Sequence, residues 1–93
     1  MASSKYSIRR AIVMALFRYF CPQDLNTILC DDQLILLSAD NARIRSEWEE
    51  LTAAEYIIPI QGFPEHRKLS DALRFKLEEG KNLLDDPFFA GPR

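Results

Sequence analysis

Side chains that could carry catalysis or hold a metal are few in this sequence. His66 is the only histidine, and Cys21 and Cys30 are the only cysteines. Their spacing matches no zinc-binding pattern, and these three residues do not make a full ligand set. The single histidine lies on an expected loop, so few side chains could serve in acid–base or nucleophilic catalysis. We expect no catalytic residue, no metal and no cofactor, and the sequence indicates no small-molecule ligand. The cysteines are expected to be buried free thiols.

The overall charge limits what the chain can bind. It carries 12 basic and 14 acidic side chains, so its formal net charge is −2. A protein held on nucleic acid mainly by phosphate contacts usually has an excess of basic residues. Any nucleic-acid binding must therefore rest on a local patch of basic side chains.

The length predicts a single domain, residues 1–93, with a flexible N-terminus at 1–6 and a C-terminal tail at 85–93. No stretch reaches the ~20 apolar residues that span a bilayer. The apolar run 11–17 follows two arginines, but Arg18 interrupts it and no small-residue cleavage site follows. We expect a cytoplasmic protein without a membrane partner.

The first half of the chain predicts a central helix followed by an ambiguous segment. Ser7 can cap a helix that ends before Pro22, and its apolar residues cover more than one side. Residues 25–37 fit two alternatives. One is a short strand at Thr27–Leu29 followed by a brief helix that Asp31 or its neighbour caps, and the other is a single helix. The pattern does not choose between them.

A third helix is predicted next. Ser38 or Asp40 can cap it, and Ile44, Trp48 and Leu51 fall at i, i+4 and i+7 on one face. Because Trp48 shares this apolar face, we expect it in the core rather than on the surface as a stacking platform.

A β-hairpin and a last helix complete the predicted elements. The strong strand formers here are Tyr56, Ile57, Ile58 and Ile60. Pro59 cannot donate to a neighbouring strand, so the strand should lie at an edge or have the Pro59 nitrogen facing outward. The stretch "QGFPEH" predicts a turn and "RKLS" the returning strand. Ser70 can cap a helix that carries Ala72, Leu73, Leu77 and, if Gly80 weakens rather than ends it, Leu84.

This order of elements resembles the winged-helix superfamily. "IRSEWEELTAAEYI" is similar to the third helix of such domains, and "IPIQGFPEHRKLS" is similar to the wing. The likeness is sharpest from Ser38 to Leu77. It implies a mainly α fold with a small β-hairpin: a winged helix-turn-helix with a three-helix core, a wing and a C-terminal helix. One departure is Glu55, which stands where many winged helices have a helix-closing glycine.

The resemblance also implies a surface for double-stranded DNA and a role in transcription regulation. In the usual geometry the third helix enters the major groove, and the wing meets phosphates or the minor groove. Arginine pairs well with guanine, and asparagine with adenine. The residues implied are Asn41, Arg43, Arg45 and Ser46 on the helix and His66, Arg67 and Lys68 on the wing.

A second interpretation makes the same helix an ordinary solvated surface. Arg43 can pair with Glu47, and Arg45 with Glu49, each at a spacing of i, i+4. Glu49 and Glu50 would also repel phosphate. The domain would then be a winged-helix module that binds protein and not DNA.

Three phenylalanines are candidates for partner contacts. Phe63, beside Gly62 at the hairpin tip, either folds back on its own domain or meets a partner. Phe88 and Phe89 either pack on the domain's own core, which is the default, or dock on another chain. Docking would give a homodimer, because the winged-helix resemblance implies pairing through terminal helices.

Overall fold

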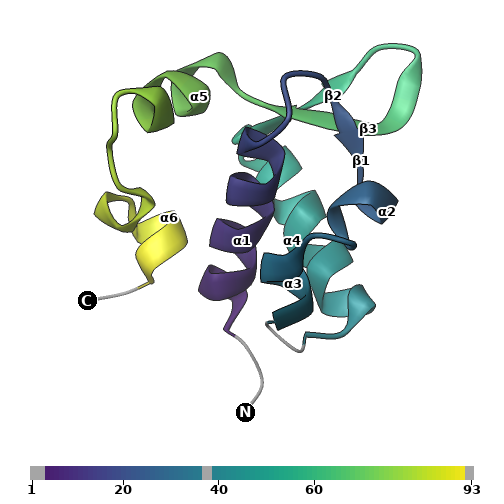
Figure 1. The fold of residues 1–93 in the computed structure, drawn as a ribbon, viewed down its shortest axis with the longest axis horizontal. Coiled ribbons are helices and arrows are strands. Elements are labelled where there is room, and N and C mark those ends of the chain that lie inside the picture. The colour runs from purple at the N-terminus through teal and green to yellow at the C-terminus, as the bar shows by residue number, and fades with distance from the viewer. Residues whose placement is uncertain (1–3, 37–38, 92–93) are drawn as a thin grey trace.

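Helices make up most of the fold, together with a small antiparallel sheet (Figure 1). The computed structural model describes residues 4–36 and 39–91. The elements in chain order are α1 (Lys5–Phe17), β1 (Gln23–Asp24), α2 (Leu25–Ile28), α3 (Asp32–Leu36), α4 (Asn41–Ala53), β2 (Ile57–Ile60), β3 (Phe63–Leu69), α5 (Asp71–Glu78), the 3-10 helix η1 (Leu83–Asp85) and α6 (Pro87–Ala90). The predicted hairpin is β2–β3, and β1 adds a third strand to it.

Helix α1 is the central helix. It lies between α4 and α6 in Figure 1 and packs against both. The sequence predicts such a position, because the helix is apolar on more than one side. The cap is Ser4 rather than the expected Ser7: the Oγ of Ser4 accepts a hydrogen bond from the N–H of Ser7 at 3.1 Å.

The sheet has the strand order β1-β3-β2, and its neighbouring strands are antiparallel. β2 lies at an edge, which is where a strand containing Pro59 is expected. The turn is shorter than predicted, because Phe63 already belongs to β3 and only Gln61 and Gly62 connect the strands. Gly62 has a φ of +86°, a conformation that favours glycine. β3 begins earlier than predicted, because Phe63 pairs with Ile60 of β2 and His66 pairs with Asp24 of β1.

The segment between α1 and α4 differs from both alternatives drawn from the sequence. β1 precedes the stretch Thr27–Leu29, in which one of the two alternatives has a strand. Instead, the Oδ1 of Asp24 accepts a hydrogen bond from the N–H of Thr27 at 2.9 Å and caps α2. Hydrogen bonding from the side chain and then the N–H of Thr27 lowers the pKa of the Asp24 carboxyl. The brief helix after Asp31 is present as α3. Its expected end, Leu37, lies outside the described residues.

Helix α4 packs through the apolar face that the sequence predicts. Ile44, Trp48 and Leu51 are buried, and Trp48 is only 1% exposed. The Oδ1 of Asp40 caps the helix by accepting a hydrogen bond from a backbone N–H three residues later, at 2.8 Å. The alternative cap, Ser38, lies outside the described residues. Trp48 is therefore a core residue and not an exposed stacking platform.

Helix α4 ends in a left-handed residue that is not glycine. Ala54 is the C-cap, and Glu55 follows with a φ of +66°. The N–H of Glu55 donates to the carbonyl of Thr52 at 3.1 Å, and the N–H of Tyr56 donates to the carbonyl of Leu51 at 3.0 Å. These two bonds form a Schellman motif, in which the left-handed position is usually glycine. Glu55 thus closes the helix as a glycine would, but at a steric cost.

The two cysteines lie outside the core. The sequence predicts buried thiols, but Cys21 and Cys30 are both exposed and free. Cys21 lies in the loop between α1 and β1, and Cys30 lies between α2 and α3, so neither is carried by the inner face of a helix or strand.

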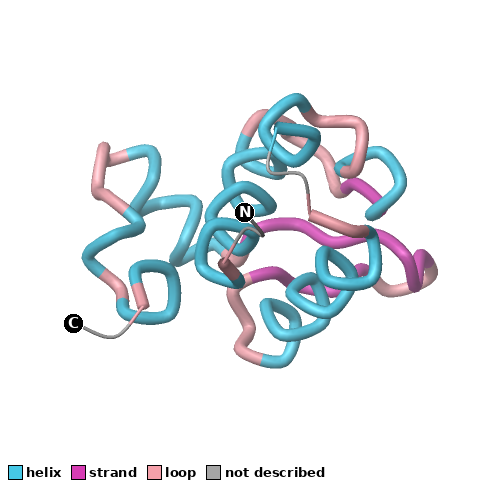
Figure 2. Tube along the Cα trace, turned by 90° about the horizontal axis from the view of Figure 1, so that it is seen from below, coloured by secondary structure: helices cyan, strands magenta, loops and turns pink. Residues whose placement is uncertain are grey.

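Residues 71–91 form an arm that leaves the sheet and returns to α1 (Figures 1 and 2). Ser70 caps α5 as predicted, because its Oγ accepts a hydrogen bond from the N–H of Leu73 at 3.2 Å. The helix ends at Glu78, and Gly80 follows with a φ of +82°. Gly80 therefore helps to end α5 rather than weakening a longer helix. Figure 2 shows the arm as a separate group of helices beside the rest of the domain.

Candidate nucleic-acid interface

The outward face of α4 carries the residues expected to meet DNA. Asn41, Arg45 and Ser46 are exposed, and Arg43 is half-buried. They face outward because α4 buries its opposite side in the core. Arg45 and Asn41 offer the hydrogen-bonding groups that read base edges. In the described part of the chain, Arg45 forms no ion pair with Glu49.

Acidic side chains share the second half of this face. Glu49 and Glu50 are exposed there. Glu47 lies differently: its Oε1 accepts a hydrogen bond from the Nε of Arg9 at 2.8 Å, and the two side chains are 13% and 8% exposed. The carboxylate therefore pairs with Arg9 of α1. This contact removes one negative charge from the outward face of α4.

Arg67 of β3 is not an exposed phosphate contact, because its side chain lies inside the fold and it is only 8% exposed. Its Nε donates to the Oγ1 of Thr52 on α4 at 3.2 Å. One terminal nitrogen donates to the carbonyl oxygens of Pro64 and His66, at 2.6 and 2.9 Å. The guanidinium also lies 5.9 Å from the ring centroid of Trp48. Arg67 therefore fastens the hairpin to α4.

Strand alternation is the signal that could have placed Arg67 inside. Successive residues of a strand point to opposite faces, so Arg67 shares the face of the buried Leu69. Lys68 points the other way and is exposed, and His66 is half-buried. Of the three hairpin residues predicted to contact phosphate, Lys68 and His66 remain accessible.

The hairpin tip carries an exposed aromatic ring. Phe63 is 59% exposed, and its ring lies edge-on to that of His66, with the centroids 5.5 Å apart. The ring contacts its own hairpin and still presents most of its surface to solvent. Phe63 is therefore available to a partner.

The other two phenylalanines pack on the chain itself. Phe89 is fully buried, and Phe88 is half-buried. The ring of Tyr56 lies 4.7 Å from that of Phe88 and 4.9 Å from that of Phe89, between centroids. The default expectation, packing on the domain's own core, is what the structure shows, so Phe89 is not available to a second chain. The expected tail, residues 85–93, contains α6, and its last two residues lie outside the described residues.

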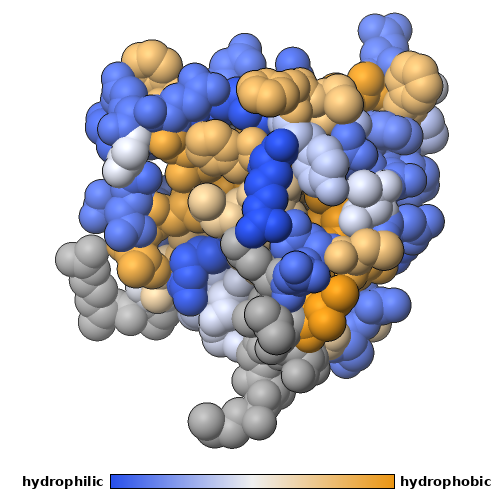
Figure 3. Space-filling model, in the orientation of Figure 1, coloured by the Kyte–Doolittle hydropathy of each residue, from blue (hydrophilic) through white to orange (hydrophobic). Residues whose placement is uncertain are grey.

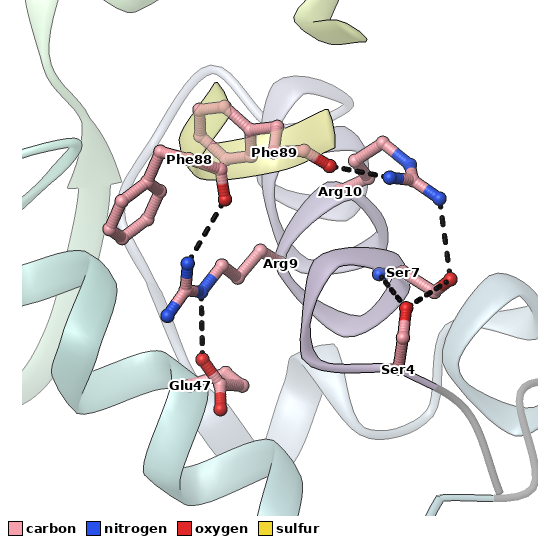
Figure 4. A network of polar contacts seen from close by, with 7 residues as sticks. All are labelled: Ser4, Ser7, Arg9, Arg10, Glu47, Phe88 and Phe89. Carbon is pink, nitrogen blue, oxygen red and sulfur yellow. Dashed lines mark hydrogen bonds and ion pairs between the residues drawn. The ribbon is translucent and has the colours of Figure 1, made fainter. Parts of the chain in front are cut away.

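Two arginines of α1 hold α6 by its carbonyl oxygens (Figure 4). Arg9 donates to the carbonyl of Phe88 at 3.0 Å, and its guanidinium lies 3.9 Å from the Phe88 ring centroid. Arg10 donates to the carbonyl of Phe89. Because Arg9 also holds Glu47, one guanidinium joins α1, α4 and α6. We call this set of contacts the arginine clasp.

Tyr56, which lies just before β2, makes a further hydrogen bond to the arm. Its hydroxyl donates to the Oδ2 of Asp86 at 2.6 Å. Burial, followed by this hydrogen bond, raises the pKa of Tyr56 to about 12. Neither this bond nor the arginine clasp was foreseen from the sequence, because the partners lie 30 or more positions apart.

The comparisons assign nothing to the chain: it matches no protein-family model, no curated protein and no solved structure. Within residues 4–36 and 39–91, no three histidine, cysteine, aspartate or glutamate side chains are grouped to hold a metal ion. No helix in that same part of the chain is long and apolar enough to cross a membrane.

The accessible residues that define what we call the α4–hairpin face are Asn41, Arg43, Arg45, Ser46, His66 and Lys68.

Proposed function

We propose that the chain is a winged-helix domain that binds double-stranded DNA and regulates transcription, with the α4–hairpin face on the DNA. The element order supports this: α3 precedes α4, β1 pairs with β3, and the β2–β3 hairpin is fastened to α4. The observation that carries the proposal is the outward display of Asn41, Arg45 and Ser46 at the start of α4, together with Lys68 on the hairpin.

The first half of α4 enters the major groove. Arg45 makes a bidentate contact with guanine and Asn41 with adenine, each contributing about 1–3 kcal/mol of discrimination against the wrong base. Lys68 and His66 contact phosphates. Arg67 does not touch the DNA, and it sets the position of the hairpin through its bonds to α4.

Phosphate contacts are few in this arrangement. Lys68 and His66 can supply about one to two. The logarithm of the affinity should therefore fall with the logarithm of the salt concentration at a slope of about −1 to −2. Glu49 and Glu50 oppose phosphate and reduce the affinity further.

Fluorescence anisotropy with a mixed-sequence duplex tests the proposal. Binding should be measurable at about 50 mM salt, and none at that concentration would refute the DNA-binding function. The double variant Asn41→Ala, Arg45→Ala should lose most of the binding. The matched control is Lys76→Ala on the exposed side of α5, which should bind like the wild type. If the double variant also binds normally, α4 does not enter the groove.

Neutralising the acidic part of the face should raise the affinity for DNA, whereas the preceding variant should lower it. The double variant Glu49→Gln, Glu50→Gln removes two exposed negative charges and no buried contact. Its affinity for the same duplex should rise, most clearly at low salt. An unchanged affinity would mean that the second half of α4 lies away from the DNA.

A second function, binding to protein without DNA, is favoured by Phe63. A ring that is 59% exposed at a hairpin tip is the kind of aromatic anchor that dominates protein interfaces. The partner can be a second copy of the chain. Sedimentation equilibrium should then show a mass that rises with concentration for the wild type but not for Phe63→Ala. A concentration-independent monomer mass for both would exclude self-association through the hairpin.

A further inference from the structure

An open groove of about 610 Å³ runs between α1 and the arm. It lies on the side of α1 away from α4, and in Figure 3, drawn in the orientation of Figure 1, apolar surface gathers between α1 and the arm. Its apolar walls are Ala11, Met14 and Phe17 from α1 and Leu77, Leu83 and Leu84 from the arm. The groove is separate from the α4–hairpin face.

The apolar walls of the groove are open to water. Met14 is 37% exposed and Leu84 is 45% exposed. Phe17, Leu77 and Leu83 are only partly buried. Covering such apolar surface is favourable, because it removes apolar area from water. An occupant with an apolar body would remove this surface from water.

The charged residues that line the groove are both basic. Arg10 and Lys81 line it, and none of the described lining residues is acidic. This differs from the whole chain, in which acidic residues outnumber basic ones by 14 to 12. Arg10 donates to the carbonyl of Phe89, which is an uncharged acceptor. Lys81 is 61% exposed, and its Nζ lies 3.5 Å from a carboxylate oxygen of Glu79, a contact that water weakens.

We propose that this groove binds a carboxylic acid with an apolar chain, that is, a fatty-acid-like ligand. The chain lies along Met14, Leu77 and Leu84, and the carboxylate meets Lys81 in the positive potential to which Arg10 adds. The volume falls within the range of about 300–1,000 Å³ that is usual for small-molecule sites. This proposal does not depend on DNA binding.

A second copy of the chain fits the groove less well than an anion does. In a two-fold symmetric dimer the same surface of each copy meets its counterpart. The cationic pair Arg10 and Lys81 would then face a second Arg10 and Lys81, and like charges repel. Charge complementarity therefore favours an anionic occupant over self-association through this groove.

Isothermal titration calorimetry with decanoate and with decanol tests the ligand class. The two probes have the same chain length, and only decanoate is charged. Decanoate should bind with one-to-one stoichiometry. Decanol should bind about fivefold more weakly, because it loses the ion contact with Lys81 and the weaker attraction of Arg10.

Two pairs of variants test the place of binding. Met14→Glu puts a negative charge in the groove and should weaken decanoate binding at least about tenfold. Its matched control is Phe75→Glu, a change at another exposed apolar residue, 61% exposed and outside the groove, which should leave binding unchanged. Lys81→Gln should weaken binding about two- to fivefold, whereas Lys76→Gln should not. Thermal unfolding of each variant confirms that it is folded.

Three results would overturn the proposal. The first is equal affinity for decanoate and decanol, and the second is normal decanoate binding by Met14→Glu. The third is a wild-type dimer in sedimentation that Met14→Glu dissociates and Phe75→Glu does not, because a second copy would then cover the groove.

Discussion

Replacing Glu55 by glycine should make the protein more stable. Glu55 closes α4 with a φ of +66°. This left-handed conformation costs a residue with a Cβ about 1–2 kcal/mol. Its side chain is exposed, so the substitution removes no buried contact. Gly80 closes α5 with the same pair of hydrogen bonds and a φ of +82°, and is the residue that this motif prefers.

The expected gain is smaller than the steric cost alone. Glycine loses about 0.5–1 kcal/mol more conformational entropy on folding than a residue with a side chain. The difference leaves a rise of about 0.5–1 kcal/mol in the free energy of unfolding for Glu55→Gly. In a domain of this size that corresponds to an increase in Tm of about 2–8 °C.

Thermal unfolding followed by circular dichroism at pH 7 measures the change. Glu55→Ala is the control, because alanine removes the carboxylate but keeps the left-handed cost, and it should be no more stable than the wild type. Gly80→Ala should lose about 1 kcal/mol, because it introduces the same cost at α5. If Glu55→Gly and Glu55→Ala unfold at the same temperature, the strain does not lie at this residue and the reasoning is refuted.

Three further substitutions test the buried contacts. Arg67→Leu should lower the free energy of unfolding, measured in urea, by about 1–3 kcal/mol, because it leaves hydrogen-bond acceptors without a donor. Arg9→Met should lower the free energy of unfolding by about 3–5 kcal/mol, because Glu47 is left nearly buried without its cation. In a double-mutant cycle, adding Glu47→Leu should recover part of this loss. The hydrogen bond from Tyr56 to Asp86 stabilises the fold fully below the unfolded-state pKa of about 10. That stabilisation is lost as the pH rises through the folded-state pKa of about 12, so Tyr56→Phe should flatten the decline of stability between these values.

The Arg9 substitution has a matched control in Arg74. Arg74 and Glu78 form an i, i+4 pair on α5 with N···O at 4.0 Å, and their side chains are 25% and 56% exposed. Arg74 also donates to the carbonyl of Tyr19 at 2.9 Å. Losing both the pair and this hydrogen bond should cost about 1–2 kcal/mol, which is still below the cost expected at Arg9. A cost for Arg9→Met no larger than that for Arg74→Met would contradict the structural importance of the arginine clasp.

Local patterns were sufficient to predict much of the fold. The spacing of Ile44, Trp48 and Leu51 indicates the buried face of α4, and Asp40 and Ser70 are caps that act within one helical turn. All these signals are carried by residues close together in the sequence. The exposed part of the candidate interface follows from the same periodicity, but its binding of DNA stays a prediction.

The unforeseen contacts are long-range. Arg9 looks like a polar edge of α1 in the sequence, and its partners Glu47 and Phe88 lie 38 and 79 positions away. No local period encodes such a pairing. Arg67 is intermediate: its alternation with Leu69 indicates an inward direction, whereas its charge favours the surface. The bonds that satisfy Arg67 inside appear only when α4 and the hairpin are placed together.

The arginine clasp should also affect the rates of folding and unfolding. Its hydrogen bonds join Arg9 and Arg10 to carbonyl groups 79 positions away, so they close a loop that contains most of the chain. Closing a long loop costs entropy, and contacts of this kind slow folding when they must form early. If they form after the transition state, they act mainly on the rate of unfolding. We therefore expect the clasp to slow unfolding, in which Phe89 leaves the core, more than it changes the rate of folding.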